Sequence, residues 1–351
     1  MEIITYKEIL SQPDIWGNII NNSDLIEKKV IEIKKECPLN SFYLVGCGTS
    51  YFLSLSGAWV LQKFLKKRAA GLTASDVYFF PESYRNSEKL DSTIFIISRS
   101  GTTTETVRVV ETLKRQGHTS VYAICCRPES ELVREVRHSF VVEDADEKSV
   151  VMTRSFTSML LLIKYISGFC SGNQQLIKEL SKLPILGRTI INHYNDLIEK
   201  FVNDLKISRF VFLGQGPFYG LVAESGLKIK EMSLSISEAY QTLEYRHGPM
   251  SMVGSEVLIV FLMSERSIPE EKKLLLEMKK LGAHTFVICD RADKEIKENS
   301  DFIVEIQSGI SEYARLILYM PITQLLGFYQ ARYKGLDPDN PKNLSQVVQI
   351  N

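Results

Sequence analysis

The sequence predicts an α/β fold of two tandem, doubly wound domains, each a parallel sheet flanked by helices. Short apolar runs alternate with helical patterns of about a dozen residues, which is typical of βαβ units. Glycines recur at a nearly constant separation, as in Gly46 and Gly214 or Gly117 and Gly282. This repeat is much longer than a solenoid unit, and it indicates a duplicated domain.

Each half contains the same order of elements. An apolar run leads into a short glycine-containing turn and a helical pattern, and a second apolar run leads into a polar loop, another helix and a third strand. In the first half we expect strands at 42–45, 93–97 and 120–125, and helices ending near 66 and spanning 104–116. In the second half we expect strands at 210–213, 257–263 and 285–289, and helices after 214–217 and at 270–280.

The same pattern gives approximate domain boundaries. We expect a helical leader, a first domain that binds phosphate, a helical connector broken at Pro184 and Gly187, a second domain and a C-terminal tail. The corresponding ranges are 1–40, 41–170, 171–206, 207–335 and 336–351.

Composition excludes several classes of protein. Lys plus Arg equals Asp plus Glu at 42 each, so no overall field attracts nucleic acid or an anionic membrane. The sequence has neither a signal-peptide pattern nor an apolar run of transmembrane length, which predicts a cytoplasmic protein. The six cysteines have no metal-ligand spacing, several lie in apolar runs typical of buried thiols, and no His, Asp or Glu cluster suggests a metal.

The segment Ser98-Arg99-Ser100-Gly101-Thr102-Thr103-Thr104 lies between a predicted strand and a predicted helix. Amide groups are unpaired at such a junction and the helix dipole favours an anion, so hydroxyls and amides there could surround a phosphate. An ordinary helix cap is the alternative. A cap explains one Ser or Thr, whereas five of these seven residues carry hydroxyls.

The turn Gly46-Cys47-Gly48-Thr49-Ser50 has the opening spacing of a dinucleotide-binding fingerprint. The third glycine is missing here and in the repeat, so we expect no nicotinamide cofactor, nor any other. Two interpretations remain open on spacing alone. The turn either brings the backbone close to a small ligand, with Thr49 and Ser50 as donors, or is only a tight connection between strand and helix.

A third polar segment spans 224–249. Glu224, Lys228 and Glu231 share one helical face, which is either a solvated set of ion pairs or part of a site. His247 follows in a His-Gly-Pro turn, and a histidine with a carboxylate suits ring opening and proton transfer between C1 and C2 of a sugar. The other four histidines lack such surroundings.

Together these motifs resemble the double sugar-isomerase (SIS) family, particularly the isomerase portion of glucosamine-6-phosphate synthase. The resemblance covers nearly the whole chain and rests on six motifs in the same order. They lie at 47–51, 98–103, 147–150, 226–231, 244–249 and 341–344.

The resemblance implies roles for particular residues. Ser50, Ser98, Ser100, Thr103 and the backbone of Arg99 would bind phosphate, and the main chain of Val150 would line the sugar site. Glu231 would move the proton between C1 and C2, and His247 would open the ring from the neighbouring subunit of a homodimer. Further expected substrate contacts are Cys47, Gly48, Thr49, Lys228 and Gln346.

Two departures from the synthase shape the functional hypothesis. The glutaminase portion is absent, so glutamine-dependent synthesis is not expected, and Gln346 stands where the synthase has a lysine, so no Schiff base can form there. We therefore expect an amino-sugar-6-phosphate deaminase or a fructosamine-6-phosphate deglycase. The alternatives are a non-catalytic sugar-phosphate sensor and, less favoured, a dinucleotide enzyme.

Overall fold

The computed structural model describes residues 3–36, 40–84, 92–348 and 350, and the chain forms two compact units. The first-repeat unit comprises residues 11–182 and 345–351, and the second-repeat unit comprises residues 1–10 and 183–344. The start of the chain therefore belongs with the second repeat, and its end with the first. The five domain ranges given above stay a prediction.

The first-repeat unit is built on a five-stranded parallel sheet in the order β2-β1-β3-β4-β5. Its strands are β1 (Ser41–Gly46), β2 (Arg68–Thr73), β3 (Ser92–Ser98), β4 (Val121–Cys125) and β5 (His138–Val141). The three predicted strands are confirmed as β1, β3 and β4. The edge strands β2 and β5 were not predicted, because they are short or carry few large apolar residues.

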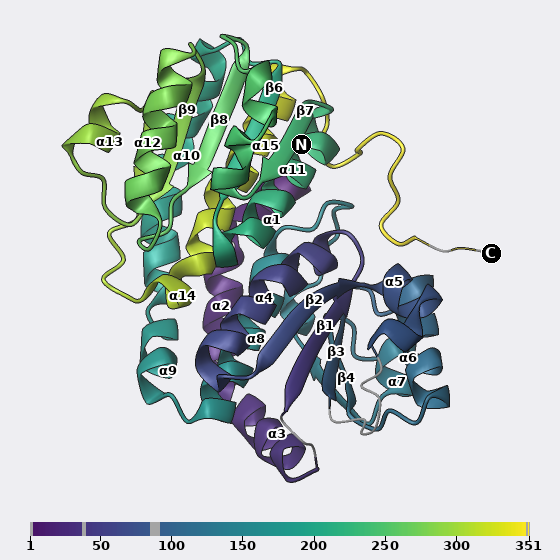
Figure 1. Ribbon diagram of the computed structural model, residues 1–351. Coiled ribbons are helices and arrows are strands. Elements are labelled where there is room, and N and C mark those ends of the chain that lie inside the picture. Colours follow the sequence, from purple (N-terminus) through teal and green to yellow (C-terminus); the bar gives the residue numbers. More distant parts are fainter. Residues whose placement is uncertain (1–2, 37–39, 85–91, 349, 351) are drawn as a thin grey trace. The chain divides into compact units, whose positions relative to one another are not determined.

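Helices cover both faces of this sheet (Figure 1). One face packs against α5 (Ala74–Phe79), α6 (Thr104–Arg115) and α7 (Glu131–Glu135), whose apolar residues share a core with β1, β3 and β4. The other layer contains α2 (Gln12–Asn21), α3 (Ser23–Glu36), α4 (Thr49–Leu65) and α8 (Arg154–Ser171), followed by α9 (Gln174–Leu180). Helix α2 is joined to α8 by a buried hydrogen bond from Trp16 Nε1 to Thr157 Oγ1 (3.1 Å).

The second-repeat unit has a sheet in the order β10-β9-β8-β6-β7, which is the same topology. Its strands are β6 (Arg209–Gly214), β7 (Ile236–Tyr240), β8 (Val257–Leu262), β9 (His284–Cys289) and β10 (Phe302–Glu305), all parallel. The two matching sheets confirm the predicted α/β class of two doubly wound domains. Again the three inner strands were predicted and the two edge strands, β7 and β10, were not.

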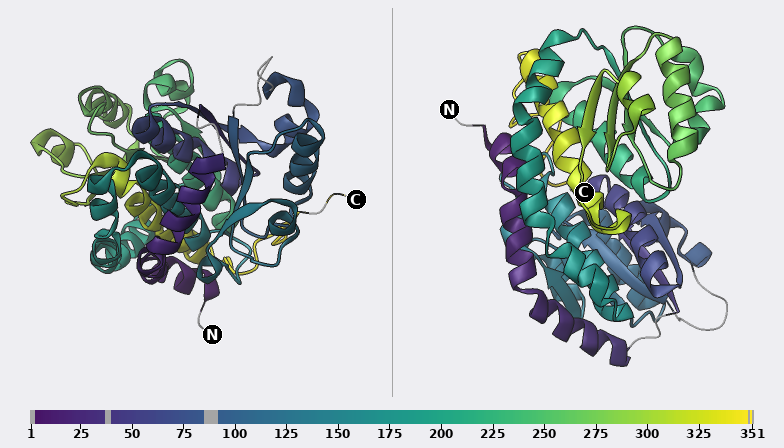
Figure 2. Two further views of the ribbon diagram at one scale, coloured as in Figure 1. Left: turned by 90° about the horizontal axis from the view of Figure 1, so that it is seen from below. Right: turned by 90° about the vertical axis from the view of Figure 1, so that its left-hand side faces the viewer.

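Helices also form two layers in this unit, and the second view of Figure 2 shows the sheet between them. One layer contains α10 (Leu183–Asp204), α11 (Tyr219–Ser233) and α15 (Met320–Tyr333), and α12 (Ile268–Lys280) and α13 (Lys294–Glu298) form the other. Helix α1 (Ile4–Leu10) packs on α15, where the rings of Tyr6 and Phe328 stack at 4.8 Å. The predicted break at Pro184 and Gly187 is wrong: α10 runs through both, because proline is compatible with a first helical turn.

Strand order decides where each unit can bind a ligand. In the first sheet the chain passes from β1 outward to β2 on one side, and from β3 outward to β4 on the other. The second sheet does the same from β6 and β8, so each sheet has a topological switch point between two neighbouring inner strands. Ligands of such sheets bind beyond the carboxyl ends of these strands. The loops that follow β1 and β3 are the two hydroxyl-bearing turns singled out in the sequence.

Other expectations concern the cysteines and the membrane. Cys125, Cys126 and Cys289 are buried free thiols, whereas Cys37 lies outside the described residues. Within the described ranges, no helix is both long and apolar enough to cross a membrane.

Helix α8 is the most completely buried helix of the first-repeat layer, since every residue from 155 to 168 is buried. The run at 156–169 is apolar on nearly all sides, which is typical of a buried helix. Leu161 has no exposed surface.

We predict that Leu161→Ala lowers the free energy of unfolding by about 2–5 kcal/mol, because the cavity cannot be filled by neighbours in a packed core. Urea unfolding measures this loss, and Leu25→Ala, at a site 57% exposed, is the control and should change stability little.

In the second-repeat unit, the loop 264–267 between β8 and α12 is bound by two internal carboxylates. The Ser264 hydroxyl and the Glu265 N–H donate to Glu312 Oε2 (2.9 and 2.7 Å). The Ser264 N–H donates to Glu271 Oε2 (3.0 Å), and the Thr242 hydroxyl donates to Glu271 Oε1 (2.9 Å). Both glutamates are buried, so this loop is closed by the protein itself.

Burial raises the pKa of Glu271 from 4.5 to about 7, although hydrogen bonds from Thr242 and Ser264 act to lower it. The folded protein therefore binds this proton more tightly than the unfolded chain. Protonated Glu271 therefore adds to the free energy of unfolding, and this contribution is complete below pH 4.5. As the pH rises toward and through 7 the contribution is lost, which lowers the free energy of unfolding by up to about 3 kcal/mol.

We predict that Glu271→Gln removes this pH dependence, so that the variant gains stability relative to the wild type between pH 5 and pH 8. Urea unfolding at the two pH values tests the prediction. Glu270→Gln, at the exposed neighbouring position, is the control and should follow the wild type. Parallel pH profiles for Glu271→Gln and the wild type would show that Glu271 does not titrate in this range.

Candidate active site

The predicted phosphate loop connects β3 to α6 in the first-repeat unit. It is folded by its own hydroxyls: Ser98 Oγ accepts from the Gly101 N–H (3.1 Å), and Ser100 Oγ accepts from the Thr102 N–H (3.2 Å). Thr103 is the N-cap of α6. Gly101 has φ +63°, and a Cβ there would lie 2.2 Å from Ser130 Oγ, so only glycine fits.

The second hydroxyl-bearing turn joins β1 to α4. Gly46 allows the helix to begin directly against the strand, because a Cβ at this position would lie 2.6 Å from the Ser50 carbonyl carbon. Gly48 is the N-cap of α4, and Thr49 and Ser50 are buried in its first turn. The glycine at position 46 is therefore explained by the close packing of the strand against the helix. Contact of this turn with a ligand stays a prediction.

The two turns line a pocket of about 60 Å³ that opens to the surface. Seven of the predicted binding residues line it: Cys47, Ser50, Ser98, Arg99, Ser100, Thr103 and Gln346. The pocket is also lined by three residues that were not predicted: Ile97, Thr106 and Met152. Of these, Thr106 could have been found from the sequence, because its hydroxyl lies in the first turn of α6.

The Arg99 side chain binds groups of the protein itself. Its guanidinium pairs with the Glu147 carboxylate (3.3 Å) and donates to the main-chain oxygens of Ser149 and Val150 (3.4 Å each). It also donates to the main-chain oxygen of Gln346 (2.8 Å). Arg99 thus joins residues 147–150 and the C-terminal tail to the loop, which is why Gln346 reaches the pocket despite its distance in sequence.

Glu147 is the buried acid on which this arrangement depends. Its carboxylate accepts from Thr153 and Ser155 at the start of α8, including Ser155 Oγ at 2.5 Å and the Ser155 N–H at 3.1 Å. Its main-chain oxygen accepts from Gln346 Nε2 (2.7 Å). The sequence reasoning gave Glu147 no role. The only feature of the nearby sequence that points to Glu147 is its position a few residues before the start of a helix rich in Ser and Thr.

Cys47 lies in the wall of this pocket without being a nucleophile. Burial and the nearby Glu105 carboxylate raise the pKa of its thiol to about 12. A thiol acts as a nucleophile in its thiolate form, so Cys47 is inert near neutral pH.

The predicted catalytic segment lies on α11 of the second-repeat unit. Lys228 Nζ pairs with Glu224 Oε1 (3.2 Å) and with Glu231 Oε2. Lys228 and Glu224 are buried, which rules out a solvated face for this pair, whereas the Glu231 side chain remains 18% exposed. Burial alone would lower the pKa of Lys228, but the two carboxylates outweigh it and raise the pKa. The ion pair with Lys228 therefore holds the Glu231 carboxylate at the surface of the helix.

His247 belongs to the same unit. It follows the 3-10 helix η4 (Thr242–Arg246), and its side chain is exposed. Glu231, Lys228 and His247 are thus in the second-repeat unit, and the hydroxyl-lined pocket is in the first. The roles assigned to all these residues stay predictions. Across the described part of the chain, no three His, Cys, Asp or Glu residues are grouped so that they could hold a metal ion.

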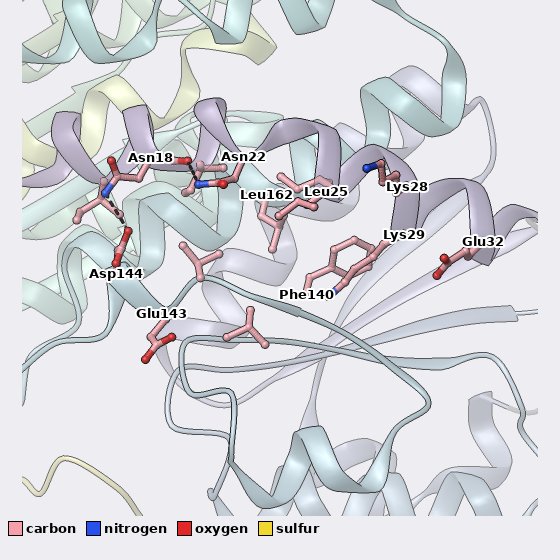
Figure 3. Close-up of a pocket in the computed structure, with 15 residues that line it drawn as sticks. Asn18, Asn22, Leu25, Lys28, Lys29, Glu32, Phe140, Glu143, Asp144 and Leu162 are labelled. Atoms are coloured by element: carbon pink, nitrogen blue, oxygen red, sulfur yellow. Dashed lines mark hydrogen bonds between the residues drawn. The ribbon is translucent and has the colours of Figure 1, made fainter.

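A larger hollow of about 570 Å³ lies elsewhere in the first-repeat unit (Figure 3). Its wall is formed by α2, α3, the end of β5 and Leu162 of α8. Lys29 Nζ donates there to the Ser139 carbonyl (2.7 Å), and Asn18 donates to Asp144 (2.9 Å). About half of its lining residues are apolar, the charged ones are of both signs and none carries a hydroxyl, so chemistry and not size favours the smaller pocket.

This chain is similar to known proteins both in sequence and in structure. The glutamine–fructose-6-phosphate aminotransferase of Francisella tularensis is 27% identical over 98% of this chain, which spans 58% of that protein's length. The structure of the C-terminal domain of this enzyme type from the same species has a TM-score of 0.84, at 25% identity over 97% of this chain and 98% of that one. The Thermotoga maritima glucosamine-6-phosphate deaminase structure has a TM-score of 0.81 and 29% identity, and covers 98% of this chain and 99% of its own.

The family match agrees with the internal repeat. The SIS domain matches residues 39–166 and again residues 205–326, one segment in each half of the chain. The resemblance found in the sequence motifs is thereby confirmed, and the chain belongs to the SIS domain family.

Proposed function

We propose that this protein is a phosphosugar isomerase-type enzyme that deaminates an amino-sugar 6-phosphate. The observation that carries the proposal is the small hydroxyl-lined pocket at the start of α6. The likeness to glucosamine-6-phosphate deaminase over nearly the full length of both chains supports deamination.

The pocket would hold the phosphate group. Ser50, Ser98, Ser100 and Thr103 supply hydroxyl donors, and the N-terminus of α6 adds amides and a favourable dipole. The Arg99 guanidinium is already neutralised by Glu147, so its side chain would position the loop while its main chain faces the phosphate. Phosphate would then be bound by neutral donors.

Glu231 would carry out the proton transfer. Once the sugar ring is open, Glu231 removes the proton from C2 and returns it to C1, while O1 gains a proton and the nitrogen loses one, which gives an imine at C2 and a hydroxymethyl group at C1. Water then adds to the imine and ammonia leaves, so glucosamine 6-phosphate plus water gives fructose 6-phosphate plus ammonia. The ion pair with Lys228 supports this role because it holds the carboxylate in one place.

The identity of residue 346 fits this reaction. Gln346 is neutral, and its side-chain amide is held by the Glu147 carbonyl. In deamination the nitrogen is already on the substrate and water attacks C2. The reaction therefore needs no amine from the protein at this position.

His247 would open the ring by taking the proton from O1 and giving one to the ring oxygen. Its exposed position makes it available to a second copy of the chain. We accordingly propose a homodimer in which His247 completes the site of the partner subunit.

We predict that Glu231→Gln lowers kcat by about 10²–10⁴-fold, because the amide cannot accept the C2 proton. Its shape is kept, so binding of glucosamine 6-phosphate should change little. Steady-state kinetics and calorimetric binding measure the two effects. The control is Lys230→Gln, on the exposed side of α11, which should retain wild-type turnover. Wild-type kcat in Glu231→Gln would exclude this residue as the base.

We further predict that glucosamine 6-phosphate releases ammonia and fructose 6-phosphate in equal amounts, whereas glucosamine without phosphate releases neither. Separate assays for ammonia, free amine and hexose phosphate test this on glucosamine 6-phosphate and on a fructosamine 6-phosphate. Release of an amine from the fructosamine alone would contradict deamination and identify a deglycase. Binding without any product would identify a sensor.

A further inference from the structure

The wall of the small pocket has two chemically different parts. One part consists of hydroxyl donors, which suit a phosphate, and its residues are Ser50, Ser98, Ser100 and Thr103. The other part consists of Met152 and Gln346, whose thioether and amide carry no charge. Gln346 Nε2 donates to the Glu147 main-chain oxygen (2.7 Å), so the group that this side chain can offer a ligand is its oxygen. An acceptor oxygen suits the hydroxyl or amino groups of a sugar and not a phosphate dianion.

Gln346 belongs to a terminal segment, residues 345–348 and 350, which is part of the first-repeat unit as the pocket is. Burial holds this segment only weakly, because Val348 and Ile350 remain 55% and 48% exposed. The Ile350 N–H donates to Thr104 Oγ1 (3.0 Å) at the first residue of α6. The position of the segment therefore depends on polar contacts.

Arg99 makes the charged contact to the terminal segment. Its Nη2 donates to the Gln346 main-chain oxygen (2.8 Å). Its Nη1 pairs with the Glu147 carboxylate (3.3 Å) and donates to the main-chain oxygens of Ser149 and Val150 (3.4 Å each). Hydrogen bonds from a charged donor are stronger than neutral ones. The two nitrogens thus serve different segments, and a lysine, which has one nitrogen, could serve only one of them.

The guanidinium of Arg99 is poorly placed to bind phosphate itself. Only 4% of its side chain is exposed. A turn toward a ligand would leave the buried Glu147 carboxylate without its cation, which is strongly unfavourable. The loop also keeps a backbone anchor that does not involve the guanidinium, because the Cys126 N–H, just after β4, donates to the Arg99 main-chain oxygen (3.0 Å).

We propose that Arg99 is a positioning residue that sets specificity for the sugar, although it lies in the phosphate loop. Nη1 holds residues 147–150 at the loop, and Nη2 places Gln346 so that its side-chain oxygen accepts from an N–H or O–H group of the sugar. The guanidinium acts through these segments and does not touch the ligand. The identity of the sugar phosphate rests on the proposed function, whereas docking of the terminal segment by Nη2 does not.

Arg99→Lys separates the two roles, since it keeps a cation beside Glu147 and loses Nη2. Calorimetry in the Glu231→Gln background, in which turnover is suppressed, compares two probes. Loss of Nη2 should leave the affinity for inorganic phosphate within about twofold and weaken binding of glucosamine 6-phosphate at least about fivefold. The matched control is Arg127→Lys, at an arginine that pairs with Asp146 (2.9 Å), and it should leave both affinities unchanged.

The two probes give distinct outcomes. Equal weakening of both would identify the Arg99 side chain as a phosphate ligand and overturn the proposal, and so would unchanged affinity for both. Failure of the protein with Arg99 intact to bind either probe would contradict the proposed function instead. Docking of the terminal segment is then decided by a measurement without a ligand.

Hydrogen exchange at the Ile350 amide, followed by NMR with isotope-labelled isoleucine, is that measurement. Arg99→Lys should raise the exchange rate at least about fivefold, because the terminal segment loses its charged anchor. In Arg99→Ala, guanidinium chloride below its unfolding range should slow the exchange again and ammonium chloride should not, because only guanidinium has several nitrogens in a planar fork. Wild-type exchange in Arg99→Lys would overturn the proposal, and this variant alone decides if circular dichroism shows that Arg99→Ala does not fold.

Discussion

A parallel strand that ends where a helix begins leaves several amide groups without helical partners, all directed to one edge of the sheet. Two such junctions, after β3 and after β8, occupy the same place in the two sheets. Something that accepts hydrogen bonds must occupy each junction. In the first repeat the loop uses its own serines and leaves a small pocket open, and in the second two glutamates fill the space.

Each unit contains candidate residues that are organised by buried charges, and these charges need partners. A buried lysine or arginine is costly unless carboxylates and hydrogen bonds compensate it. Arg99 and Glu147 satisfy each other and hold the tail and residues 147–150 around the pocket, and Lys228 is held between Glu224 and Glu231. In both cases the pairing fixes groups that the proposed reaction uses, and removal of the basic partner would leave a buried carboxylate, Glu147 or Glu224, without its cation.

The inner strands and the hydroxyl loops were predictable because their signals are local. Strands such as β3 and β8 are continuous apolar runs, and a cluster of Ser and Thr before a helix is visible in the sequence. The edge strands β5 and β10 have only four residues each, and their pairing depends on the neighbouring strand. The roles of Glu147 and Glu312 could not be predicted either, since each is defined by a contact with a residue distant in sequence. The break expected at Pro184 failed because a proline at a helix start and one at a helix break give the same local signal.

The central claim is that the open junction after β3 binds the phosphate group of a sugar. Calorimetric titration of the Glu231→Gln variant, in which turnover is suppressed, with glucosamine 6-phosphate and with glucosamine tests it most directly. The account predicts that the phosphorylated sugar binds at one site per chain and that removal of the phosphate weakens binding by at least about a hundredfold, or roughly 2.7 kcal/mol. Equal affinity for the two sugars would contradict it.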